Sequence, residues 1–320
     1  MTSSLPPEVR SCFERFITTE FTTIDRRQQP ITWPVTPYYA DGAPTIDVST
    51  GLGYPKKADD ARRNPHVSLL FSDPTGCGIE TKTRVLVQGT ATIDDRDLDA
   101  NAERYFRESG LKLPATRRMH PPRPLRKPLA WYYTRIYVKV RPERIFVWPE
   151  GDPTEPPDVL DARMEEVRAG HSTEPAEPHE PAAAAPIIWD QRLEQLGTRY
   201  PTAALAWVGP DGFPISVRMP VSVDHDARRL RLGAEPAGLP LAEGRACLAA
   251  HAHADDFTWQ ENFQVRGDLV RDGEGWALAP QRLIGGFELP RGLGRYRSFL
   301  TRHWRFYRTA SRRRRELTRG

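Results

Sequence analysis

The sequence lacks the features that would assign it to a membrane or secreted class. No apolar run approaches the ~18 residues needed to cross a bilayer, so we expect no membrane partner. Residues 1–8 do not combine a basic stretch with an apolar one, so they do not predict a secretory signal. The expected location is therefore cytoplasmic.

Cysteine is also scarce. Cys12, Cys77 and Cys247 are the only three among 320 residues, and no two of them lie close in the sequence. An odd count at such spacing argues against a disulfide framework and against a cysteine-based zinc site. We expect three isolated, reduced thiols.

Lysine is sparse beside arginine, and the positive charge is unevenly distributed. Residues 291–320 contain eleven Arg and one Glu, a net charge of +10, so the other 290 residues carry 4 − 10 = −6. The basic character therefore belongs to one C-terminal segment. Abundant Arg, Ala, Asp and Pro with little Lys favour a GC-rich genome, such as that of an actinobacterium.

Hydrophobic periodicity predicts a β-rich first half. The expected strands are 21–25, 31–39, 45–50, 66–71, 84–93, 131–140 and 144–148, the expected helices are 7–17, 56–64 and 96–109, and 113–128 is expected to be a basic loop. Pro34 and Pro37 cannot donate to a β-ladder, so their strand must be an edge strand or be broken.

The second half repeats the order of the first. Residues 29–32 (QPIT) match 213–216 (FPIS), and 86–89 (LVQG) match 264–267 (QVRG). Comparable strand patterns lie between the matched pairs, with similar spacing. The repeat predicts two β units of similar topology.

Segment 46–71 carries the most chemical information. A strand brings the Ser49 and Thr50 hydroxyls to its end, a glycine-containing turn follows, and Lys56 and Lys57 begin a helix. Free backbone N–H groups, the positive end of a helix dipole, hydroxyl donors and ammonium groups together form a phosphate site. The alternative is a solvated lysine pair.

The order of these elements resembles a known superfamily. After the lysines come a short helix, Asn64-Pro65, an apolar strand, and a later strand, 83–89, that ends in Val-x-Gly. This order is similar to the core of the pyridoxamine 5′-phosphate oxidase and flavin/deazaflavin oxidoreductase superfamily, over residues 8–148 and, by pattern only, 188–280. The resemblance implies a mainly β fold with flanking helices: two tandem six-stranded split β-barrels in a pseudo-dimeric arrangement.

With this resemblance the chain divides into four segments. They are 1–150, a split barrel with the cofactor phosphate site; 151–186, a Pro/Glu/Ala-rich linker with a short helix at 158–168; 187–290, a degenerate second split barrel; and 291–320, an Arg-rich helix. Residues 237–245 replace the lysine-bearing segment in the second barrel, so we expect one cofactor per chain.

The resemblance implies FMN as cofactor. Lys57, with Lys56, would neutralise its phosphate, the strand 32–36 would run beside the isoalloxazine, and Arg84 would contact the ring or the phosphate. The implied cofactor-binding residues are Thr32, Trp33, Val35, Thr36, Ser49, Thr50, Lys56, Lys57 and Arg84. Arg218, Trp259 and Arg266 are candidates to face the site from the second barrel.

The expected function is a flavin-dependent oxidoreductase that transfers hydride to or from an unknown small molecule, with the cofactor supplying the redox chemistry. No catalytic residue can be assigned, although Tyr38, Tyr54 and His66 are candidate proton donors. The oxidases carry Arg and Lys where this chain has Thr32 and Pro37, so pyridoxamine phosphate is not the expected substrate. Such proteins typically form dimers, which leaves a homodimer open.

Two other cofactors stay open. The first is the deazaflavin F-420, whose acidic tail could use the basic loop 117–127. The second is haem, with His251 and His253 as candidate ligands. These two histidines, with Asp255 and Asp256 after them, are a weak metal signal, so we expect no metal site.

A non-catalytic alternative is nucleic-acid binding through Arg312–Arg315. The apolar residues of the tail instead recur at helical spacing, which predicts a helix packed on a barrel with arginines on its solvated face. These residues are Leu293, Tyr296, Leu300, His303, Trp304 and Tyr307. We therefore do not expect a nucleic-acid partner.

Overall fold

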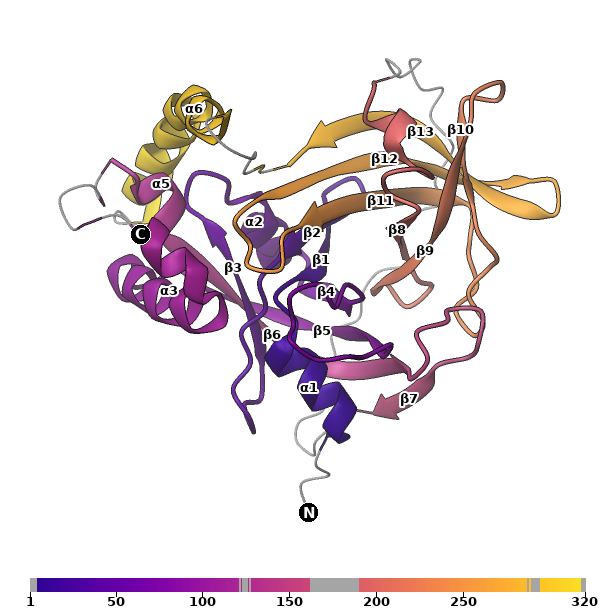
Figure 1. Cartoon of the computed structure of the whole chain (residues 1–320), viewed down its shortest axis with the longest axis horizontal. Coiled ribbons are helices and arrows are strands. Elements are labelled where there is room, and N and C mark those ends of the chain that lie inside the picture. The colour runs from indigo at the N-terminus through magenta and orange to yellow at the C-terminus, as the bar shows by residue number, and fades with distance from the viewer. Residues whose placement is uncertain are drawn as a thin grey trace.

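Two β units that share an interface form most of the protein. The structure, a computed structural model, describes residues 5–120, 122, 126, 128–161, 190–286, 288 and 294–317. Helices α3, α5 and α6 gather on the side of the first unit that faces away from the second (Figure 1). No helix among these residues has both the length and the apolarity to cross a membrane. The predicted mainly β fold with flanking helices is confirmed.

The first unit is an open antiparallel sheet. Its strands are β1 Thr19–Ile24, β2 Pro30–Val35, β3 Ile46–Gly51, β4 His66–Phe71, β5 Arg84–Asp94, β6 Arg135–Trp148 and β7 Asp158–Asp161. The order is β2-β1-β4-β5-β6-β3, and β7 pairs with β6. Strand β2 is an edge strand that ends at Val35, as the two prolines predicted. Beyond its end, an isolated bridge pairs Tyr38 with Asp47 of β3.

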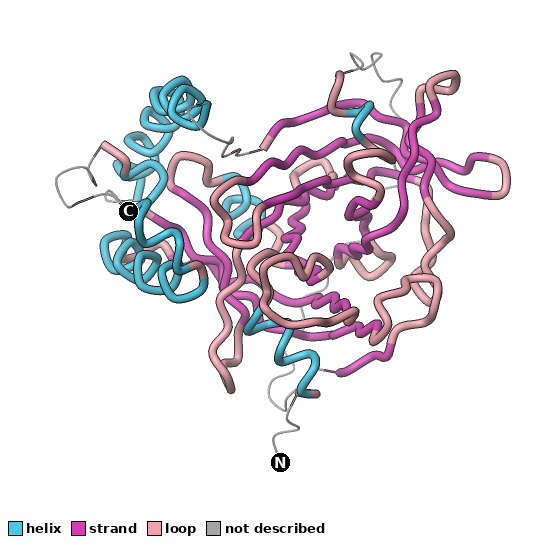
Figure 2. The backbone as a smooth tube through the Cα atoms, viewed as in Figure 1, coloured by secondary structure: helices cyan, strands magenta, loops and turns pink. Residues whose placement is uncertain are grey.

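The second unit is a closed barrel (Figure 2). Its strands are β8 Thr202–Val208, β9 Pro214–Asp224, β10 Arg229–Leu232, β11 Gly244–His253, β12 Gln260–Asp272 and β13 Gly275–Gly285. The order β9-β8-β11-β12-β13-β10 is that of the first sheet, strand for strand, and β10 closes the barrel by pairing with β9. The two units therefore share one strand order.

The repeated Val-x-Gly motif forms the same β-bulge in both units. The register shifts between Gln88 and Gly89 in the first unit and between Arg266 and Gly267 in the second. At each bulge the opposite strand lies very close to the glycine. A Cβ on Gly89 would lie 2.3 Å from the Arg141 carbonyl oxygen, and a Cβ on Gly267 would lie 2.0 Å from the Ala279 carbonyl oxygen. Glycine is required here because no side chain fits.

Strands β4 and β5 are buried on both faces. Leu69 and Val87 belong to the core of the first unit, whereas Leu70 and Leu86 belong to the core of the second. Successive side chains of a strand point to opposite faces, so each strand contributes to two cores. This explains why residues 66–71 form an almost continuous apolar run.

Polar side chains between the units bond to each other or to backbone. Thr22 Oγ1 lies 3.0 Å from Thr32 Oγ1 and 2.9 Å from Ser216 Oγ. Gln88 donates to the Pro214 carbonyl and Gln264 to the Thr32 carbonyl, at 3.1 and 3.3 Å. These contacts satisfy groups that would be costly to bury alone.

The helices differ from the prediction in two places. They are α1 Pro7–Arg15, α2 Lys56–Arg63, α3 Leu98–Lys112, α5 Ala130–Tyr133 and α6 Gly294–Leu317, with 3₁₀ turns at Pro114–Met119 and Leu193–Gln195. Residues 131–133, predicted as strand, are helical, and β6 then runs unbroken to Trp148. Residues 158–161, predicted as helix, form β7 because they pair with β6. The rest of that predicted helix and most of the 152–186 linker lie outside the described residues.

The two bulge glycines provide a stability test. Gly89→Ala and Gly267→Ala should each lower the free energy of unfolding by about 2 kcal/mol or more, because the strand must move to admit the methyl group. In the control Gly275→Ala, the nearest atom to the new Cβ is 3.7 Å away, and we expect a change below about 0.5 kcal/mol. Urea unfolding measures all three. Equal stability of the bulge variants and the control would contradict this account of the bulges.

Candidate cofactor site

The lysine-bearing turn joins β3 to α2. Tyr54 N–H donates to the Gly51 carbonyl at 3.0 Å, and a Cβ on Gly51 would lie 2.7 Å from the Tyr54 ring. Helix α2 begins at Lys56 after Pro55 and ends at Arg63, before the Asn64-Pro65 pair. The predicted strand, glycine turn and short helix are therefore all present.

Most of the predicted backbone donors of this turn already have protein acceptors. Leu52 N–H donates to the Thr134 carbonyl at 3.0 Å, and Gly53 N–H donates to the Trp131 carbonyl at 2.8 Å. The Thr50 hydroxyl donates to the Tyr54 carbonyl at 2.9 Å. An anion here would have to rely on side-chain cations more than on the backbone.

The two lysines of the turn have different environments. Lys56 is about half exposed and pairs with Asp60, with Nζ 2.7 Å from Oδ2. Lys57 is more enclosed, and its ammonium lies 5.4 Å from the centroid of the Tyr54 ring. Burial, together with the charge of Arg135, lowers the pKa of Lys57 to about 8. In the described part of the chain no carboxylate pairs with Lys57.

Arg135 is a site residue that the sequence did not reveal. It begins β6 opposite Gly51 and is only 5% exposed. Its guanidinium lies 3.9 and 4.4 Å from the ring centroids of Tyr105 and Tyr132, and Nη1 donates to the Tyr54 hydroxyl at 3.2 Å. Its Nε is buried without an acceptor, and among the described residues no carboxylate forms an ion pair with it.

Ser49 lies on the same face of the sheet as Arg135. The pairs Ser49–Tyr137 and Gly51–Arg135 are two residues apart in one antiparallel register, and such partners share a face. Ser49 is partly exposed. The structure thus brings Ser49, Lys57 and Arg135 into one region behind the turn.

The other predicted cofactor residues lie elsewhere. Thr32 is buried between the units, where its carbonyl accepts from Gln264. Trp33 lies beside Gly286, and Val35 and Thr36 are partly exposed at the end of β2. Arg84 donates to the Arg218 carbonyl at 3.4 Å.

Helix α6 covers the turn. Phe306 stacks on Trp131 with centroids 5.2 Å apart, and a Cβ on Gly53 would lie 2.9 Å from Phe306 Cβ. Ala310 is buried, whereas Tyr307, predicted on the packed face, is 40% exposed. The predicted helix is confirmed, with Phe306 and Ala310 on its packed face. Of the other predicted apolar residues, Leu293 and the side chains of Tyr296, Leu300, His303 and Trp304 lie outside the described part.

The basic segments make internal contacts. In α6, Arg313 pairs with Asp59 at 2.6 Å and Arg314 with Asp99 at 3.1 Å. In the loop after α3, Arg117 donates to the Gly110 carbonyl at 2.6 Å and Arg126 pairs with Glu103 at 2.8 Å. Residues 121, 123–125 and 127 of that loop lie outside the described residues.

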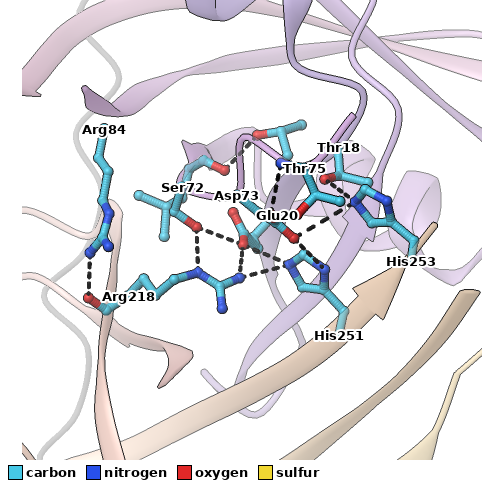
Figure 3. A network of polar contacts seen from close by, with 11 residues as sticks. Thr18, Glu20, Ser72, Asp73, Thr75, Arg84, Arg218, His251 and His253 are labelled. Atoms are coloured by element: carbon cyan, nitrogen blue, oxygen red, sulfur yellow. Dashed lines mark hydrogen bonds and ion pairs between the residues drawn. The ribbon is translucent and has the colours of Figure 1, made fainter. Parts of the chain in front are cut away.

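A second polar cluster lies between the units (Figure 3). Glu20, 1% exposed, pairs with Arg218 and accepts from Ser72 at 2.7 Å. His251 Nε2 lies 2.8 Å from both the Glu20 carboxylate and the Arg218 guanidinium. Burial would raise the pKa of Glu20, but Arg218 and the bonds from His251 and Ser72 outweigh it and lower the pKa to about 2. Arg218 was a candidate to face the cofactor site from the second barrel. It does contact the first unit, but at this cluster rather than at the β3–α2 turn.

Comparison with known proteins gives a likeness of fold. No family profile matches the sequence, and no curated protein is significantly similar to it. Similar solved structures include a putative pyridoxamine 5′-phosphate oxidase from Listeria innocua (17% identity, 44% of this chain and 96% of the other, TM-score 0.31). Another is the conserved hypothetical protein Rv2991 from Mycobacterium tuberculosis (22% identity, 53% of this chain and 95% of the other, TM-score 0.33). A third is the haem storage protein HutZ from Vibrio cholerae (16% identity, 45% of this chain and 94% of the other, TM-score 0.32). The chemistry of the site must be argued from its own residues.

The Glu20 cluster predicts an acid-sensitive stability. Because the pKa of Glu20 is lower in the folded state than the usual 4.5, its contribution is fully present above pH 4.5 and is lost as the pH falls towards 2. Glu20→Gln should be less stable than wild type at neutral pH, and the difference should shrink by roughly 3 kcal/mol between pH 4.5 and 2.

Urea unfolding across this pH range measures the difference. The control is Glu150→Gln, since Glu150 is 78% exposed and pairs with the exposed Lys82. A difference between wild type and Glu20→Gln that does not change with pH would show that Glu20 is not ionised in the folded protein.

Proposed function

We propose that this protein binds a phosphate-bearing flavin-type cofactor, FMN or the deazaflavin F-420, at Lys57 and Arg135. We further propose that it acts as an oxidoreductase on a small molecule. One observation carries the proposal: two enclosed cations lie behind the β3–α2 turn, and no carboxylate of the described chain neutralises either.

The energetics of these cations favour an anionic ligand. A buried charge without a partner destabilises a protein by about 3–5 kcal/mol. Arg135 gains only partial compensation from the faces of Tyr105 and Tyr132. A phosphate monoester carries a charge of about −1.5 to −2 at neutral pH, which would match both cations.

The neighbouring groups fit a phosphate rather than a carboxylate. The free Arg135 Nε and the Lys57 ammonium are charged donors, and the Ser49 and Tyr54 hydroxyls are neutral ones. Four donors from separate side chains suit the three terminal oxygens of a phosphate. The position of the turn also agrees with the order of elements in the oxidoreductase superfamily that the sequence resembles.

In this proposal the cofactor supplies the hydride chemistry when it is bound. Lys57 and Arg135 hold its phosphate, and α6 excludes water from the turn through the contact of Phe306 with Trp131. Tyr54, whose pKa is raised to about 12 by burial, stays protonated and can donate a hydrogen bond at neutral pH.

The described residues favour FMN over the alternatives. Arg117 and Arg126 belong to the loop that could have served the acidic tail of F-420, and they are bonded to Gly110 and Glu103. His251 and His253, the candidate haem ligands, are 6% and 7% exposed between the units. Of the four arginines of α6 that would bind nucleic acid, Arg313 and Arg314 pair with Asp59 and Asp99.

Cofactor titration tests the proposal. We expect wild type to bind FMN more tightly than riboflavin, which lacks the phosphate, and Lys57→Ala to weaken FMN binding by about tenfold or more, since a charged hydrogen bond contributes about 1.5–3 kcal/mol. The matched control is Lys56→Ala, because Lys56 is paired with Asp60 and more exposed. Flavin fluorescence and the visible spectrum of the purified protein measure both.

The pH dependence gives a second readout. With a Lys57 pKa of about 8 in the free protein, FMN affinity should fall above that pH, because the neutral amine no longer attracts the phosphate. Lys57→Ala should lose this fall. Below about pH 6 the phosphate itself takes up a proton, which should weaken binding in wild type and in Lys57→Ala alike. The proposal is wrong if wild type takes up neither FMN nor F-420, or if the two lysine variants lose affinity equally.

A further inference from the structure

A candidate metal site lies between the two units, apart from the cofactor turn. His251 and His253 come from β11 of the second unit, and Asp73 follows β4 of the first. One donor atom from each lies within 4.8 Å of the other two. The Asp73 carboxylate is 3.6 Å from His251 Nδ1 and 3.7 Å from His253 Nε2, and Figure 3 shows both rings beside it.

The hydrogen bonds of His251 leave its Nδ1 available. Nε2 lies 2.8 Å from two groups, the Glu20 carboxylate, which can only accept, and the Arg218 guanidinium, which can only donate. A metal at Nδ1 requires the tautomer in which Nε2–H donates to Glu20, and in that tautomer the contact with Arg218 is not a hydrogen bond. Nδ1 then carries a lone pair, and it is buried without a hydrogen-bond partner. The whole side chain is only 2% exposed. An unsatisfied nitrogen in the interior is destabilising, and a ligand would relieve this.

His253 has the corresponding arrangement. Its Nδ1 lies 3.0 Å from the Ala254 carbonyl, which can only accept, so the proton belongs on Nδ1 and the lone pair on Nε2. Thr18 Oγ1, 3.1 Å from Nε2, is the only recorded hydrogen-bond partner of this atom among the described residues.

The surroundings have the pattern of a metal site. A ligating histidine usually donates its second N–H to a carboxylate or a backbone carbonyl, and here Glu20 and the Ala254 carbonyl take these positions. In the described part of the chain, the ion-pair contacts of Asp73 are with these two histidines alone. Its side chain is 19% exposed, and Pro74 and Thr75, which follow it in the chain, line a surface hollow of about 550 Å³.

We propose that Asp73, His251 and His253 bind one divalent transition-metal ion of the zinc type, which links the two units. Two imidazole nitrogens and one carboxylate are a known ligand set for such ions. Bonds of about 2.1 Å require the three side chains to close by about 0.5–1 Å. The Thr18 hydroxyl gives up its bond to His253, and water completes the coordination.

The test uses the full chain, stripped of metal with a chelator and titrated with Zn²⁺ by calorimetry. We expect one Zn²⁺ per chain, and Asp73→Asn should weaken binding at least tenfold while keeping the size of the side chain. The control Asp255→Asn removes a neighbouring exposed carboxylate and should change affinity less than twofold. Mg²⁺, which prefers oxygen ligands, should not compete.

Thermal unfolding distinguishes loss of the site from loss of the fold. At about 100-fold excess over Kd, Zn²⁺ should raise the wild-type midpoint by about 5 °C. Asp73→Asn should unfold near the wild-type midpoint in chelator but lose this rise. No uptake by wild type at 100-fold molar excess, unchanged affinity in Asp73→Asn, or equal loss in the Asp255 control would each overturn the proposal. The test is independent of FMN binding.

Discussion

Burial of both faces of β4 and β5 is the constraint on which the rest of the structure depends. Leu69 and Val87 pack in one core, and Leu70 and Leu86 in the other. Neither unit can therefore leave the other without exposing part of its own interior to water. Polar groups buried between them are costly without partners, and the hydroxyl contacts of Thr22 and the pairing of Glu20 with Arg218 supply such partners.

Two of the buried side-chain atoms that have no hydrogen-bond partner point to ligands. Arg135 Nε and His251 Nδ1 are both buried and without a hydrogen-bond partner. The first lies beside another cation, Lys57, and the second lies beside the Asp73 carboxylate. The two sites therefore call for ligands of opposite charge, a phosphate in one case and a metal ion in the other. They draw on different elements, since the first belongs to one unit and the second spans both.

The sequence predicted local structure better than it predicted the sites. The apolar run after Asn64-Pro65 predicted β4 at its observed bounds, and the repeated Val-x-Gly motif, which predicted two similar β units, lies at the paired bulges. Residues 131–133 were wrongly assigned to a strand, since aromatic residues favour strands, yet the Trp131 carbonyl accepts from Gly53 in a short helix. Tertiary packing brings Arg135 close to Lys57, and Asp73 close to His251. The members of each pair are far apart in the sequence, so the spacing of a motif could not predict either contact.

The docking of α6 has a consequence for the order of assembly. Phe306 and Ala310 pack on the first unit although they follow the second in the chain. In the sequence, the second barrel is thus inserted between parts of the first unit. The β3–α2 turn is covered by α6 only after the ribosome has synthesised the second barrel and α6 itself. A nascent chain exposes the turn throughout translation of the second barrel. During that interval the turn is open to small molecules that the finished fold encloses.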